Sequence, residues 1–218
     1  MVLNALKKGI AAFNRATGRG AKLFMLIVVV IFLLFIGWTV VEEISGARQA
    51  RVRQHAARGA ELKQKRQYTQ AEQEYRAALL LDPQDAGLYV SLAGVLALQN
   101  KWDDAAASAR EALRLNPNDD DAHNNLGAAL AGKGDWAGMI TEEREALRLN
   151  PNNDAAHAGL GVALGSNGDW AGMITEEREA LRLNPNNDMA HNNLGAALEN
   201  KGDWDGAITE CRAARRCA

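Results

Sequence analysis

The sequence of 218 residues holds only four prolines and two cysteines, and few of the motifs that carry chemistry. It has no glycine-rich phosphate loop after a strand, no Gly-x-Ser-x-Gly nucleophile turn and no His-Glu-x-x-His helix. The adjacent carboxylates Glu142 and Glu143 recur as Glu176 and Glu177 within an identical stretch of sequence. A repeated pair is typical of a duplicated segment rather than of a single active site. The sequence therefore predicts a protein that is not an enzyme, with no catalytic residue, cofactor or metal site.

The two cysteines, Cys211 and Cys217, lie six residues apart near the C-terminal end. Six residues turn an α-helix by about 600°, so the two thiols would point to different sides. An intramolecular disulfide would require the last helix to fray, whereas a bridge between two chains stays open as an alternative.

The prolines are evenly spaced, at Pro83, Pro117, Pro151 and Pro185. Residues 134–154 are repeated letter for letter as residues 168–188. Steps of the same length divide the whole stretch 49–218 into five tandem units without an insertion. A fixed period of about 34 residues predicts a repeat architecture.

Each unit contains the pattern of two short amphipathic helices. In the third unit, Leu126 and Leu130 lie about one helical turn apart, and Gly134 interrupts the helix. Apolar residues at helical spacing resume at Trp136 and end before Pro151, because proline cannot continue a helix interior. One hairpin of this size cannot bury its apolar stripe, so its stability must come from contacts with neighbouring units. The sequence thus predicts an all-α fold of stacked helical hairpins.

The recurring residues resemble the tetratricopeptide repeat family. The aromatic residue that opens each second helix is Tyr68, Trp102, Trp136, Trp170 or Trp204, and the alanine ten residues later is Ala78, Ala112, Ala146, Ala180 or Ala214. The resemblance implies a right-handed α-solenoid of five helix-turn-helix repeats, at about residues 52–85, 86–119, 120–153, 154–187 and 188–218. It also implies a concave groove, lined by the first helices, that binds protein or peptide partners.

The resemblance places small and amide side chains in that groove, and these are the candidate partner-binding residues: Asn124, Asn125, Ala128, Val162, Asn192, Asn193, Glu199 and Asn200. An asparagine side chain offers two donors and an acceptor, which suits the backbone of an extended peptide. The alternative is that the asparagines only hydrogen-bond between helices. No lysine or arginine occupies the three positions of each repeat that hold a terminal carboxylate in some family members, so that binding mode is disfavoured.

All four histidines recur at one place in the repeat, as His55, His123, His157 and His191. Neighbours in such a stack would lie about 10 Å apart, too far to share a zinc ion whose bonds are roughly 2.0–2.1 Å. Packing residues are therefore expected. The resemblance places Glu143 and Glu177 in the interior, where a buried carboxylate needs a partner. We hypothesise that each glutamate pairs with the histidine of its own repeat, His123–Glu143 and His157–Glu177; the alternative is that both glutamates reach solvent.

An uncharged apolar run extends from Leu23 to Val41. At about 1.5 Å per residue it reaches roughly 28 Å, close to the thickness of a bilayer's hydrocarbon core. A cleaved signal peptide is the alternative, but the run is too long and the polar segment before it too extended. Residues 23–41 are therefore predicted to form one transmembrane helix that contacts a lipid bilayer.

Residues 1–22 hold five basic residues and no acid, which favours either a basic amphipathic segment or a positive flank that sets topology. The basic excess favours a cytoplasmic N-terminus with the repeats on the other side. For a bacterial chain this means an inner-membrane protein with periplasmic repeats. Residues 42–51 are expected to be a short linker to an array that fills residues 52–218.

Charge is unevenly distributed along the array. Residues 49–82 carry seven basic and four acidic residues, whereas the remaining units carry 12 basic and 21 acidic residues. Because the acidic units repel phosphate, no nucleic-acid partner is expected. The last repeat ends without a covering helix, which is consistent with a homo-oligomer through the C-terminal repeat or with a fragment. We predict a membrane-anchored adaptor that binds protein segments in the groove, with a self-assembling scaffold protomer as the alternative.

Overall fold

The computed structural model describes residues 7–9, 11 and 19–217. These residues form two compact units, divided between Ala50 and Arg51. Within the described ranges the chain is helical nearly throughout and contains no β-strand. The all-α fold predicted from the sequence is therefore confirmed.

The first unit consists mainly of the N-terminal part of helix α2 (Arg19–Gln64). The apolar run 23–41 lies within α2, which by length and composition alone could cross a membrane. Most of the described apolar side chains of this run are exposed, among them Leu34 at 68% and Phe35 at 58%. Residues 42–51, expected as a linker, also lie within α2. Most of the predicted amphipathic segment 1–22 falls outside the described residues.

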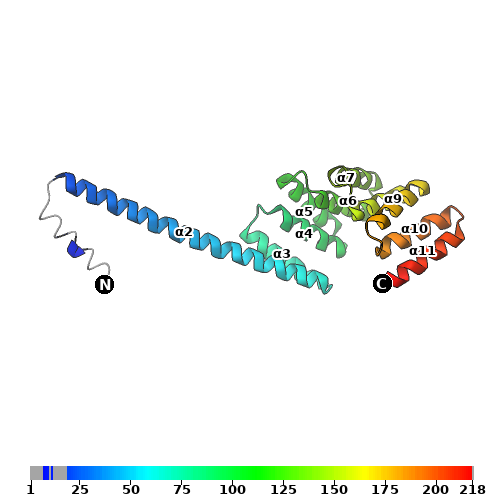
Figure 1. Ribbon diagram of the computed structural model, residues 1–218, viewed down its shortest axis with the longest axis horizontal. Coiled ribbons are helices and arrows are strands. Elements are labelled where there is room, and N and C mark those ends of the chain that lie inside the picture. The colour runs from blue at the N-terminus through cyan, green and yellow to red at the C-terminus, as the bar shows by residue number, and fades with distance from the viewer. Residues whose placement is uncertain (1–6, 10, 12–18, 218) are drawn as a thin grey trace. The chain divides into compact units, whose positions relative to one another are not determined.

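The second unit is a stack of helical hairpins (Figure 1). After the last part of α2 come α3 (Tyr68–Leu81), α4 (Ala86–Leu98), α5 (Trp102–Leu115), α6 (Asp120–Gly132), α7 (Trp136–Leu149), α8 (Asp154–Ser166), α9 (Trp170–Leu183), α10 (Asp188–Asn200) and α11 (Trp204–Cys217). From α3 onwards each helix packs against the next, and the first helices α4, α6, α8 and α10 also touch in succession. These first helices therefore share one side of the stack.

Short polar residues set where the helices begin. Each first helix from α4 onwards follows an Asp or Asn whose side chain accepts a hydrogen bond from the backbone N–H three residues further on: Asp85, Asp119, Asn153 and Asn187. The second helices α7 and α9 start in the same way after Asp135 and Asp169. Each cap of this kind typically contributes about 1 kcal/mol.

The turn inside each hairpin contains one residue with positive φ. Three repeats place glycine there, with φ between 81° and 84°, at Gly134, Gly168 and Gly202. The first two repeats place Arg66 and Asn100 there, each with φ 59°. The five turns thus share one left-handed conformation, which glycine adopts without the steric cost that a Cβ brings.

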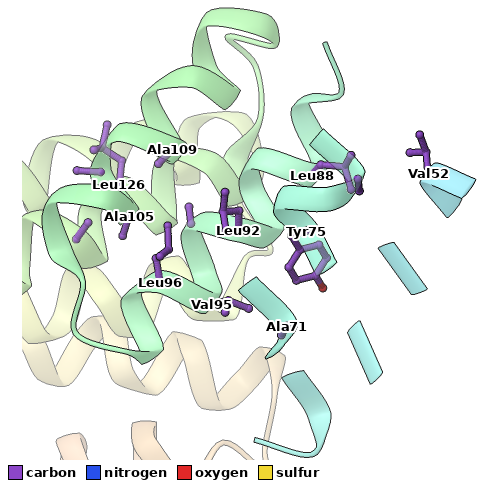
Figure 2. Close-up of a cluster of buried hydrophobic side chains, with 14 residues drawn as sticks. Val52, Ala71, Tyr75, Leu88, Leu92, Val95, Leu96, Ala105, Ala109 and Leu126 are labelled. Atoms are coloured by element: carbon purple, nitrogen blue, oxygen red, sulfur yellow. The ribbon is translucent and has the colours of Figure 1, made fainter. Parts of the chain in front are cut away.

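The core is shared between neighbouring repeats rather than enclosed by any one of them. One cluster of buried side chains extends from Val52 in the first repeat through Leu92 to Leu126 in the third (Figure 2). The Tyr75 ring lies so close to Gly59 that a Cβ at Gly59 would come within 2.9 Å of it. Close approach of this kind requires small residues, and many of the fully buried side chains are alanines. This is the packing expected of an array in which each hairpin is stabilised by its neighbours.

Substitutions in the hairpin turns should change stability in opposite directions. In Gly134→Ala the new methyl group would meet no atom within 4 Å, so backbone strain alone should lower the free energy of unfolding by about 1 kcal/mol. Arg66→Gly removes that strain from the first repeat and should raise stability by up to about 1 kcal/mol. Guanidinium unfolding followed by circular dichroism measures both. Midpoint shifts of the same sign would contradict the shared turn geometry.

Candidate functional site

A groove of about 770 Å³ runs along the first helices of the array. It extends from Lys63 in the first repeat to Asn193 in the fifth. The other lining residues are Gly94, Ala97, Leu98, Trp102, Asn124, Asn125, Ala128, Ala131, Gly132, Trp136, Met139, Glu143, Ala155, Ala158, Gly159, Val162, Asn187 and Met189. Its volume is typical of ligand pockets, which measure about 300–1,000 Å³.

The structure brings five of the eight predicted groove residues together in this lining: Asn124, Asn125, Ala128, Val162 and Asn193. The remaining three, Asn192, Glu199 and Asn200, are exposed side chains outside it. Glu199 borders a separate hollow of about 350 Å³ beside Trp204 and Cys211. A partner-binding role for the eight residues stays a prediction.

The second helices contribute groove residues that the sequence reasoning missed. Trp102, Trp136, Met139 and Glu143 reach the lining from α5 and α7. The Trp102 ring occupies the space that a Cβ at Gly132 would need. The glycine at position 132 was the one feature of the sequence that could have predicted this close contact with the Trp102 ring.

Three groove asparagines form hydrogen bonds between helices, as the alternative interpretation of the sequence predicted. Asn125 Nδ2 donates to the backbone oxygen of Val90, at 3.1 Å. Asn124 Nδ2 donates to Glu143 Oε2 at 3.0 Å, and Asn193 Nδ2 donates to Glu177 Oε1 at 2.9 Å. A primary amide has two donors and two acceptor lone pairs, so one such bond leaves each amide further hydrogen-bonding capacity.

Glu143 lies in the wall of the groove with only 1% of its surface exposed. Its Oε1 is wedged between two glycines of successive first helices, because a Cβ at either Gly127 or Gly159 would come within 2.6 Å of that oxygen. Burial raises the pKa of Glu143 to about 8; the bond from Asn124 opposes this shift and the neighbouring Glu142 adds to it. At neutral pH the carboxyl group is therefore mainly uncharged.

Glu177 repeats this arrangement one unit further on and is fully buried. A Cβ at Gly161 would lie 2.9 Å from its Oε1, and its Oε2 has no hydrogen-bond partner. Burial raises the pKa of Glu177 to about 8. The hydrogen bond from Asn193 lowers this pKa, and the neighbouring Glu176 raises it. Because an unpaired charge is costly in the interior, the neutral acid is the favoured form.

The hypothesised histidine–glutamate pairs are wrong in their partners. His123 Nδ1 lies 2.7 Å from Glu142 Oε2, and His157 Nδ1 lies 2.7 Å from Glu176 Oε2. Successive residues point about 100° apart on a helix, so when Glu142 faces the histidine, Glu143 points between the first helices of its own repeat and the next, beside Gly127 and Gly159. The alternative that Glu143 and Glu177 reach solvent is also wrong, since both are buried. Among the described residues, no cluster of His, Cys, Asp and Glu could hold a metal ion.

Charge is almost absent from the groove. Lys63 and Glu143 are its only ionisable lining residues, and the lining contains no histidine, cysteine or serine that could act as a nucleophile or base. Burial raises the pKa of Asp121, the neighbouring Asp120 and Asp119 raise it further, and the Lys63 ammonium opposes the shift. Beyond Lys63, the groove offers amide hydrogen bonds and apolar contact.

Comparisons with known proteins agree with this geometry. Models of the tetratricopeptide repeat match residues 55–85, 94–134 and 178–209. No curated protein matches the sequence. Solved structures share the fold at low sequence identity, between 19% and 23% for three of them, and each of the three covers between 73% and 77% of this chain.

One of these similar structures is TTC0263, a thermophilic repeat protein of Thermus thermophilus. It is 19% identical with a TM-score of 0.70, covering 77% of this chain and 91% of that chain. A second, MamA, is 23% identical with a TM-score of 0.58, covering 73% and 93%. YrrB, described as having an unusual peptide-binding site, is 20% identical with a TM-score of 0.53, covering 75% and 84%. The chain is thus an α-solenoid that contains tetratricopeptide repeats.

The two buried glutamates should make stability fall as pH rises. Both bind protons in the folded state up to about pH 8, whereas an unfolded glutamate loses its proton near its ordinary pKa of 4.5. Between these limits the folded state holds more protons, so each residue should lower the free energy of unfolding by about 1.4 kcal/mol per pH unit. Urea unfolding of the wild type and of Glu143→Gln/Glu177→Gln at pH 5.5, 6.5, 7.5 and 8.5 measures this slope.

The double variant should show a flatter pH dependence and should exceed the wild type in stability at pH 8.5. Glu145→Gln is the matched control, because its hydrogen bond with Arg148 holds the pKa of Glu145 below its ordinary value. That residue stays ionised in both states across the range, so the slope should not change. An unchanged slope in the double variant would show that the buried acids ionise normally.

Proposed function

We propose that this protein is a membrane-anchored adaptor that binds segments of partner proteins in the groove of its repeats. Tetratricopeptide repeats mediate protein–protein interaction and peptide binding, and the chain contains them. The observation that carries the proposal is the continuous groove of about 770 Å³ through five repeats, lined by amide and small side chains. All eight predicted residues, Asn124, Asn125, Ala128, Val162, Asn192, Asn193, Glu199 and Asn200, remain candidates for contacting the partner.

The anchor in this proposal is the apolar run 23–41 within α2. Its exposed leucines, valines and phenylalanines would be unfavourable in water, whereas a bilayer's hydrocarbon core accommodates them without cost. A helix also satisfies its own backbone hydrogen bonds, which a spanning segment must do. We further propose a bacterial inner-membrane location, with a cytoplasmic N-terminus and periplasmic repeats, on the strength of the basic N-terminal flank.

We favour the adaptor over a self-assembling scaffold, which remains the alternative. The outer side of α11 exposes Trp204 at 61% and Ile208 at 50%, and this is the observation on which a homo-oligomer through the C-terminal repeat would rest. Neither the groove nor its asparagines has a role in such an assembly. Cross-linking from the groove therefore separates the two functions.

A photo-reactive amino acid introduced in place of Asn125 should cross-link partner proteins in cells. Asn125 lines the groove, whereas Ala137 is exposed on α7 and does not line it. The same group at Ala137 is thus the matched control and should give none of the products seen from position 125. Products that consist only of the protein itself would support the scaffold instead. Identical products from both positions would contradict groove binding.

The full chain should stay in the membrane fraction after an alkaline wash. Arginine at the centre of a span costs about 2.5–3.5 kcal/mol, so Leu33→Arg/Leu34→Arg should release the protein into the wash. Gln49→Arg/Ala50→Arg adds the same charge outside the apolar run and should not. A reporter enzyme active only outside the cytoplasm, fused after Ala218, should be active. Complete extraction of the wild type would refute the anchor, and an inactive reporter would refute the orientation.

A further inference from the structure

The electrostatic character of the groove differs from that of the array around it. The second to fifth units carry 12 basic and 21 acidic residues, yet only Lys63 and Glu143 among the lining residues can ionise. Lys63 lies in the first repeat, and Glu143 is buried and mainly neutral at pH 7. Beyond Lys63, a partner in the groove therefore meets almost no charge.

The walls of the groove suit an apolar chain that approaches closely. Ala128 and Ala131 form part of the lining, and their small side chains leave room for a partner's backbone. Trp102 and Trp136 add apolar surface from the second helices, and aromatic side chains contribute much contact area in binding sites. Contact with this surface would remove apolar area from water on both partners, which is favourable.

Polar groups along the groove indicate that its occupant also forms hydrogen bonds. Asn125 and Asn193 each use one N–H within the array and retain an amide oxygen and a second N–H. A peptide backbone supplies the matching N–H and C=O groups, whereas a lipid acyl chain would cover these amides and leave them unsatisfied. The occupant that fits both kinds of surface is a polypeptide.

We propose that the groove selects an uncharged, mainly apolar segment of a partner polypeptide and excludes acidic segments. This inference rests on the proposed function and names the chemistry of its partner. The segment's main chain hydrogen-bonds to Asn125 and Asn193, and its side chains lie against Trp102 and Trp136. An acidic side chain that lies beside Glu143, beyond Lys63, would lose its hydration without gaining a cation as partner, which is unfavourable.

Selection from a random dodecapeptide phage library tests this chemistry. The bait is the full chain in detergent micelles, after the library has been depleted on empty micelles. The selected peptides should contain fewer acidic residues than the starting library. An aspartate introduced at the centre of a selected peptide should weaken binding about tenfold or more, which corresponds to about 1.4 kcal/mol.

Charge placed in the groove should change the selected peptides predictably. Ala128→Glu should enrich basic peptides, and Ala128→Lys should enrich acidic ones, because Ala128 lines the groove. Ala137→Glu adds the same charge at an exposed position outside the lining and should leave the selected pool unchanged. Circular dichroism of each variant confirms that the array remains folded.

Three results would overturn the inference in distinguishable ways. Acidic peptides selected by the wild type would refute the exclusion of acids and leave groove binding intact. Suppose that dihexanoylphosphatidylcholine displaces the selected peptides from the wild type and that both Ala128 variants select the same peptides as the wild type. The occupant of the groove would then be a lipid chain. If no peptide is enriched on the wild type, both the inference and the proposed function fail.

Discussion

Every part of the array depends on packing between hairpins that cannot be stable alone. The cluster from Val52 to Leu126 crosses three repeats, and the Trp102 ring fills the space above Gly132 of the following repeat. Helices that approach this closely need alanine or glycine on one side and a large ring on the other. The same arrangement leaves the first helices on one side of the stack, so the contacts that stabilise the array also form its groove.

The buried glutamates are the exception to this apolar packing. Glu143 fits between Gly127 and Gly159 because both glycines lack a side chain, and Glu177 has a carboxylate oxygen without any partner. In the last repeat the equivalent residue is Cys211, which is exposed rather than buried. Glu143 lies in the groove wall, whereas Glu177 is not among the residues that line it.

The lining of the groove is nearly uncharged, although the array around it is acidic. The acidic excess of the second to fifth units would repel other acidic surfaces. In the proposed function the lining would bind a partner through amide hydrogen bonds and apolar area, which depend little on ionic strength. A similar structure such as YrrB is only 20% identical to this chain; it shows the fold alone, and the chemistry of the groove comes from the residues of this sequence.

The sequence by itself determined the period of the repeats, the helix boundaries from α3 onwards and the turns, because Pro, Gly and capping Asp or Asn act on the local backbone. The resemblance to the tetratricopeptide repeat family also suggested eight groove residues, five of which line the groove on the first helices. Only the tertiary structure decided that Glu142 faces His123 while Glu143 is buried, and that Trp102 and Met139 reach the groove. Adjacent residues differ by about 100° around a helix, so a small rotation between repeats decides which one is buried, and that rotation depends on packing across repeats rather than on the pattern within one.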